Sequence, residues 1–144
     1  MHPFPHHYSV VVSVRPGETA KLRAAELTEI ESAPPKEFDG PGDRWSPEGL
    51  FTAAIADCIV LNFQGIAANS KFAWSRLEAT TNAQLDRVEG KMRFTPVDTH
   101  IALVIPEGAN PARARLLLEK SEATCPVSNT LNCEKHLTMA IEVA

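Results

Sequence analysis

Hydrophobic and polar residues alternate over part of a short segment near the beginning of the chain. The even-numbered positions from Tyr8 to Val14 are apolar, with serines between some of them. A period of two is typical of a half-buried β-strand. Residues 15–18 (Arg-Pro-Gly-Glu) form a turn signal, and residues 22–30 predict a second and a third short strand. Prolines and glycines then make residues 33–45 an irregular loop.

A long apolar segment, residues 46–69, occupies the middle of the chain. Ser46 is a good helix N-cap, Pro47 is tolerated at the first helical position, and Glu48 lies favourably near the positive end of the helix dipole. The residues that follow are apolar on nearly every side, so a helix here must be covered all round. A small sheet covers one side. A second helix or a second subunit must cover the other, and we expect the subunit.

This segment is also long enough to raise the question of a membrane span. Asp57, Asn62 and Gln64 lie near its middle. A buried Asp is costly in lipid, so we expect a buried helix of a soluble protein and no membrane partner.

The second half of the chain predicts a hairpin, a helix and a closing strand. Residues 72–105 read as a long β-hairpin that turns at Glu89-Gly90, residues 111–123 form an amphipathic helix, and residues 137–143 form the last strand. The order β-β-(β)-α-β-β-α-β predicts an α+β fold with antiparallel pairing. Residues 1–144 fit one domain.

The composition and charge of the chain limit the classes of partner that it can bind. Hydrophobic residues make up 44% of the chain and charged residues 22%, with a net charge of −4. No basic cluster occurs, which argues against a nucleic-acid partner. The N-terminal residues lack the basic and apolar regions of a secretion signal. Three cysteines without an export signal favour a reducing, cytoplasmic location, where thiols persist for reactivity or packing.

The cysteines are the candidates for chemistry. Cys58 lies within the apolar segment, and taken alone it is more typical of packing than of reactivity. Cys125 is followed by Pro126, which breaks the preceding helix. If a short helix begins at Pro126, Cys125 is its N-cap and the helix dipole stabilises its thiolate.

Two segments resemble a known family. Residues 46–58 (SPEGLFTAAIADC) are similar to the central helix of the OsmC/organic hydroperoxide resistance family, which shows a Pro-Glu pair, an alanine-rich turn and a cysteine ten residues after the glutamate. Residues 125–129 (CPVSN) resemble the family's second cysteine motif. The loop 33–42 and the hairpin residues 85–90 also look like family segments, so the resemblance covers nearly the whole chain from about Tyr8.

The resemblance implies an OsmC-like fold, an intertwined homodimer and a peroxidase. Cys58 would attack an organic hydroperoxide and become a sulfenic acid, and Cys125 would resolve it as a disulfide. An external dithiol, which in the family looks like a lipoylated protein, would reduce that disulfide. No cofactor is implied.

The resemblance also implies roles for a carboxylate and an arginine at the site. Glu48 would orient an arginine beside the Cys58 sulfur. Ten helical residues separate Glu48 from Cys58, about 15 Å along one helix, so a shared site needs Glu48 from the partner chain. The family's arginine is missing just before Phe38-Asp39-Gly40. Arg15, Arg23 and Arg44 remain as candidates, and we choose Arg44 because it lies four residues from Glu48.

Two other functions stay open. A dimer with this fold could bind an apolar ligand without turnover, an alternative that the missing arginine supports. A disulfide oxidoreductase acting on protein thiols is a third possibility, although the chain has no Cys-x-x-Cys motif. We expect Cys133 to be non-catalytic and the histidines at positions 2, 6 and 7 to be a solvated end. The cysteines lack the spacing of a zinc site.

Overall fold

The computed structural model describes residues 2–144. They divide into two units, one that ends at Leu50 and one that runs Phe51–Ala144.

The first unit carries a three-stranded antiparallel sheet in the order β1-β2-β3. Its strands are β1 (Val11–Ser13), β2 (Ala20–Arg23) and β3 (Ile30–Ser32). All three strands were expected. The prediction that the first strand is half-buried is wrong for a single chain, because every residue of β1 is exposed. Beyond β3 the loop holds a short 3-10 helix, η1 (Lys36–Phe38), and returns so that Trp45 pairs with Ser32.

The long helix α1 (Pro47–Asn69) begins where the sequence predicts. The Ser46 hydroxyl accepts the backbone N–H of Gly49 at 3.0 Å, the bond expected of an N-cap. By length and composition α1 could cross a membrane. It is instead a core helix, because a stripe of its residues is buried at helical spacing within the fold: Ile55, Ile59, Phe63 and Ala67.

The predicted hairpin forms the centre of the second unit. Strands β4 (Arg76–Val88) and β5 (Lys91–Ile105) pair antiparallel, with Val88 opposite Lys91 across the turn. The turn residues Glu89 and Gly90 have φ values of 51° and 79°. Two successive positive φ values define a type I′ turn, whose twist matches that of the strands it joins.

The last strand, β6 (Lys135–Val143), pairs with β5 in parallel, so the sheet β4-β5-β6 is mixed rather than wholly antiparallel. A parallel pair needs a crossover connection, and the two helices α2 (Pro111–Ala123) and α3 (Pro126–Asn129) supply it. The side chain of Asn110 caps α2 by accepting the N–H groups of Ala112 and Arg113.

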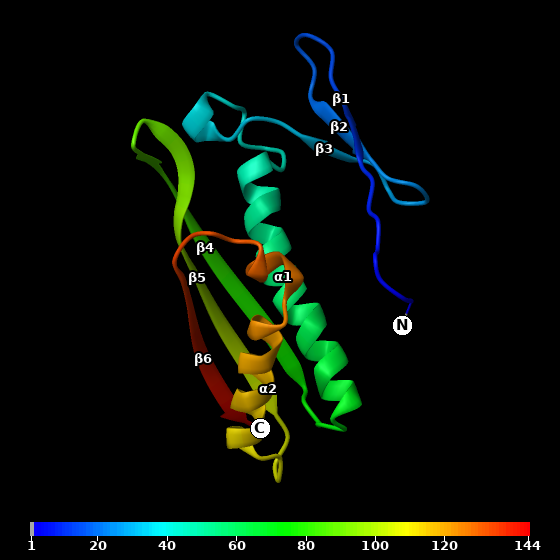
Figure 1. Cartoon of the computed structure of the whole chain (residues 1–144), viewed down its shortest axis with the longest axis vertical. Coiled ribbons are helices and arrows are strands. Elements are labelled where there is room, and N and C mark those ends of the chain that lie inside the picture. The colour runs from blue at the N-terminus through cyan, green and yellow to red at the C-terminus, as the bar shows by residue number, and fades with distance from the viewer. Residues whose placement is uncertain (1) are drawn as a thin grey trace. The chain divides into compact units, whose positions relative to one another are not determined.

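The core of the second unit lies on one face of this sheet. Alternate residues of β5 from Val97 to Ile105 are buried, and the intervening side chains are more exposed. Figure 1 shows α1 and α2 on the same side of the sheet, and their buried residues join those of β5 in one cluster.

Candidate functional site

Cys58 lies in the fourth turn of α1, next to the buried stripe of that helix. Ile55 and Ile59 on either side of it point into the core and are 1% exposed. Cys58 itself is half-buried and packs against the core cluster. Its sulfur therefore has an apolar surrounding and retains some access to the outside.

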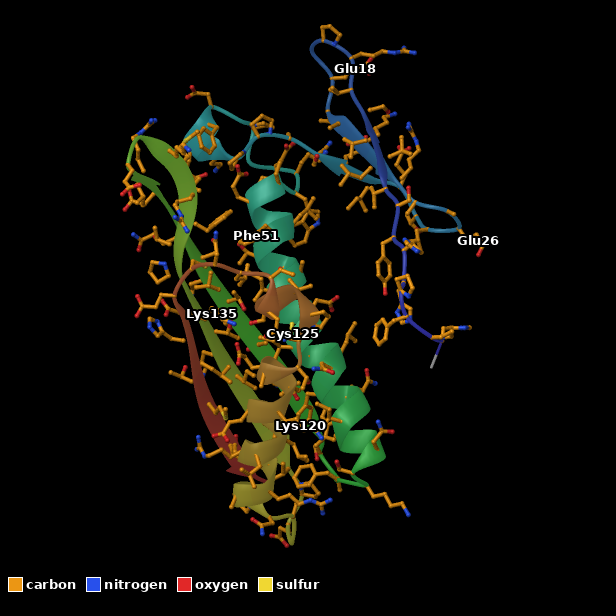
Figure 2. All side chains as sticks on the ribbon, viewed as in Figure 1. Glu18, Glu26, Phe51, Lys120, Cys125 and Lys135 are labelled. Carbon is orange, nitrogen blue, oxygen red and sulfur yellow. The ribbon has the colours of Figure 1, made fainter. Side chains whose placement is uncertain are left out.

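Cys125 lies at the corner where α2 ends and α3 begins (Figure 2). Pro126 starts α3, and Cys125 is its N-cap with an extended backbone, as the sequence predicts. The backbone N–H of Ser128 donates to the Cys125 sulfur at 3.3 Å. Unlike Cys58, Cys125 is completely buried.

Burial raises the pKa of the Cys125 thiol to about 11. A side-chain hydrogen bond and a charge interaction with Cys58 contribute to this rise, and the backbone donors of Ser128 and Val127 oppose it. The backbone donors at the start of α3 therefore act in the expected direction, but they do not set the net pKa shift. The helix α3 has only four residues, and the loss of hydration on burial outweighs its donors. At neutral pH Cys125 is a protonated thiol.

The same hydrogen bond shows that the two cysteines are neighbours. It favours the neutral form of the Cys125 thiol and so raises its pKa. Both cysteines are reduced in this structure. The fold thus places a buried, protonated thiol against a half-buried one, the arrangement from which a disulfide can form.

Asn62, one helical turn beyond Cys58 on α1, ties the Cys125 corner to that helix. Its Nδ2 donates to the carbonyl oxygen of Ser121 and to Oγ1 of Thr124, both at 2.8 Å. Sequence reasoning used Asn62 only as evidence against a membrane span. Its four-residue spacing from Cys58, which puts both on one helix face, is the signal that could have found it.

A second polar cluster connects α3 to α2 and to β6. Glu122 on α2, Ser128 on α3 and Lys135 on β6 meet there: the Ser128 hydroxyl donates to Glu122 at 2.9 Å, and Lys135 Nζ donates to the Ser128 carbonyl at 3.1 Å. Lys135 and Glu122 also form an ion pair at 3.5 Å. Three elements that are distant in sequence supply this cluster, so no sequence motif could have predicted it.

Arg44 and Glu48 both belong to the first unit. Arg44 pairs with Glu31 at 2.9 Å and with Asp43 at 3.0 Å. The Arg44 hydrogen bond lowers the pKa of Glu31, and that same bond raises the pKa of Arg44. Glu48 lies in the first turn of α1 with its Oε2 atom shielded from solvent. Their catalytic roles stay predictions.

The first unit also contains an apolar cleft of about 400 Å³. It is lined mainly by apolar residues and by two carboxylates, Glu18 and Glu48. Ligand pockets of small molecules have volumes in this range. The other apolar side chains of its wall include Val14, Ala20, Pro35 and Phe38.

The remaining candidates take no part in this geometry. Cys133 is a free, half-buried thiol in the loop before β6 and packs against the core. His6 makes a hydrogen bond through Nε2 to the carbonyl of His2 and stacks on Phe4. Within residues 2–144, no group of three His, Cys, Asp or Glu residues is arranged to hold a metal ion.

Comparison with known proteins places these features in context. The family model described as "OsmC-like protein" matches residues 40–140. The uncharacterised protein YmaD of Bacillus subtilis is 23% identical over 114 residues, which cover 76% of this chain and 76% of that protein. Peroxiredoxin OsmC of Escherichia coli is 26% identical over 89 residues, 62% of each chain. An OsmC-like protein of unknown function from Vibrio cholerae has the same fold, with a TM-score of 0.85, 16% identity, and coverage of 94% of this chain and 100% of that one.

Proposed function

This chain belongs to the OsmC-like protein family, and we propose that it is a thiol peroxidase that reduces organic hydroperoxides to alcohols. The observation that carries the proposal is the contact between Cys58 on α1 and Cys125 at the α2–α3 corner. Two reduced thiols in contact, one half-buried and one fully buried, suit a two-step redox cycle. The resemblance to peroxiredoxin OsmC of Escherichia coli supports the same reaction class.

In the first step the Cys58 thiolate attacks the distal oxygen of the hydroperoxide. The O–O bond breaks, the alkoxide takes a proton and leaves as the alcohol, and Cys58 becomes a sulfenic acid. Cys58 is assigned this role because it is the more accessible of the two sulfurs. Cys125 is protonated and buried, and a thiol is a far weaker nucleophile than a thiolate.

In the second step Cys125 condenses with the sulfenic acid. The sulfur of Cys125 bonds to that of Cys58, the S–O bond breaks, and the Cys125 proton leaves with the hydroxide as water. The protonated thiol already carries the proton that the departing hydroxide needs, but it attacks more slowly than a thiolate would.

An external dithiol returns the disulfide to two thiols by exchange. It must attack the sulfur of Cys58, because Cys125 has no exposed surface. We propose a small or flexible dithiol, such as the lipoyl group of a lipoylated protein, since a half-buried sulfur admits a thin carrier more readily than a folded protein surface. A reducing cytoplasm would supply such a reductant.

The peroxidase would act as a homodimer with its site at the interface. Apolar side chains on both units support this: Val11 on β1 is 60% exposed and Leu61 on α1 is 56% exposed. Apolar surface of this extent favours a second copy as the cover. In such a dimer Glu48 of the partner subunit would orient the arginine near Cys58, and Arg44 is the arginine we propose.

One observation favours a second function. The apolar cleft of the first unit could hold an apolar ligand in a protein without turnover. The two functions differ in one respect: only the peroxidase requires Cys58 to react with peroxide faster than an ordinary free thiol.

The deciding experiment is intact mass analysis with peptide mapping after one equivalent of cumene hydroperoxide is added to the reduced protein, with hydrogen peroxide in parallel. The peroxidase predicts rapid loss of two hydrogens, mapped to Cys58–Cys125 and faster with the organic peroxide. Cys58→Ser should abolish the reaction, and the matched variant Cys133→Ser should leave it intact. Slow or scattered oxidation, or a bridge that involves Cys133, would refute the peroxidase and leave ligand binding as the better account.

A further inference from the structure

The Cys125 corner contains an irregularity that has to be stabilised from outside its own helix. At the end of a regular α-helix the N–H of Cys125 would donate to the carbonyl of Ser121, four residues earlier. Here that N–H donates to Glu122 instead, at 3.1 Å. Ser121 is 0% exposed, so its carbonyl needs another donor.

Asn62 supplies that donor from α1. Its amide nitrogen bonds the Ser121 carbonyl and the hydroxyl of Thr124, the residue immediately before Cys125. The Thr124 hydroxyl in turn donates to the carbonyl of Lys120 at 2.8 Å. One amide group thus fastens the last turn of α2 at two points.

The same residue is fixed in position relative to Cys58. Four helical residues separate Cys58 and Asn62, about 6 Å along α1, and this spacing puts both on one face. Ile59 and Phe63 in this stretch are 1% and 0% exposed, so they pack this part of α1 into the core. The two bonds of Asn62 therefore hold the Cys125 corner against the part of α1 that carries Cys58.

We propose that Asn62 is a positioning residue for disulfide closure: its amide holds the α2–α3 corner against α1, so that Cys125 meets the Cys58 sulfenic acid as soon as that acid forms. This inference rests on the proposed peroxidase cycle. The reaction concerned joins the two sulfurs and releases water. Closure of this kind depends steeply on the approach of the reacting atoms.

The test separates formation of the sulfenic acid from its resolution. Reduced protein is mixed with one equivalent of cumene hydroperoxide, quenched over time with a sulfenic-acid trap, and analysed by mass spectrometry. In Asn62→Leu, which keeps the size and loses both donors, peroxide consumption should proceed at the wild-type rate. Disulfide closure should be roughly tenfold to a hundredfold slower. In excess peroxide the lingering sulfenic acid should advance to the sulfinic acid.

Two further variants keep the test decisive. Thr124→Val removes one of the two bonds and leaves Asn62 in place, so it should slow disulfide closure by less than Asn62→Leu does. It also provides the test if Asn62→Leu does not fold. Asn110→Ala removes the N-cap at the far end of α2 and serves as the control for a loss of stability. It should close the disulfide at the wild-type rate.

The outcomes are distinguishable. If wild-type protein forms no Cys58–Cys125 disulfide, the proposed function fails and the role of Asn62 with it. If wild type forms the disulfide and folded Asn62→Leu closes it equally fast, the peroxidase stands and the positioning role is refuted. Equal slowing in Asn62→Leu and Asn110→Ala would also refute it, because the effect would then follow stability rather than the tie to α1.

Discussion

Replacing Cys125 with Ala should change how the stability of the reduced protein depends on pH. The wild-type chain buries a thiol whose pKa burial raises to about 11, and the variant does not. The comparison therefore reports the protonation of Cys125 together with its hydrogen bond to Cys58. It needs no substrate, and it tests whether the corner excludes water as the structure indicates.

The sign follows from which state keeps the proton. In the unfolded chain the thiol ionises near its ordinary pKa of 9.0, whereas in the folded chain it stays protonated until about pH 11. Between these values the folded state binds more protons, so stability falls as the pH rises. The contribution is complete below about pH 9 and is lost by about pH 11. At roughly 1.4 kcal/mol per pH unit the loss comes to about 2–3 kcal/mol.

The assay is urea denaturation of both proteins at fixed concentration, with a phosphine reductant, at pH 7, 8, 9, 10 and 11. Ionisable groups that do not contact Cys125 are common to both proteins, and their contributions cancel in the difference. At pH 7 that difference reports the lost packing of the sulfur and its lost hydrogen bond to Cys58. It should shrink by about 2–3 kcal/mol between pH 9 and 11. A difference in the free energy of unfolding that stays constant across this range would show that Cys125 is hydrated in the folded protein. That result would refute the raised pKa of Cys125.

Three further outcomes are expected. Lys135→Met should lower the free energy of unfolding by about 1–3 kcal/mol in urea denaturation, because Glu122 keeps a half-buried carboxylate without its cation; a wild-type midpoint would contradict this. Ser46→Ala should cost about 1 kcal/mol through loss of the α1 N-cap, visible as a lower Tm; an unchanged Tm would contradict it. Formation of the Cys58–Cys125 disulfide should raise the free energy of unfolding by up to about 4 kcal/mol. Coincident unfolding curves for the oxidised and reduced proteins would refute that closure.

The parts of the fold that the sequence predicted are those that short segments determine. The helix α1 begins after Ser46 because one hydroxyl caps its first turn. The hairpin turns at Glu89-Gly90, where Gly90 adopts the positive φ that a type I′ turn requires at no steric cost. Each feature depends on residues within a few positions of one another, so its signal is present in the sequence itself.

The parts that the sequence did not predict depend on contacts between distant segments. The expected antiparallel pairing omitted the parallel β6, because its direction follows from how the crossover packs and not from the strand residues. The cap at Cys125 was predictable from Pro126, whereas the raised pKa reflects burial by residues elsewhere in the chain. The bonds of Asn62 to Ser121 and of Lys135 to Ser128 likewise join separate elements.

The protonation of Cys125 has two opposing consequences for the proposed cycle. It protects the resolving cysteine, because a buried thiol is a poor nucleophile toward peroxide and leaves the first oxidation to Cys58. It also slows resolution, because attack on the sulfenic acid gains from thiolate character that Cys125 lacks. Proximity is the factor that can offset this loss, since a well-oriented intramolecular partner gains a high effective concentration. A high pKa at Cys125 therefore makes a firm connection between its corner and α1 necessary, and the two bonds of Asn62 are where the fold provides it.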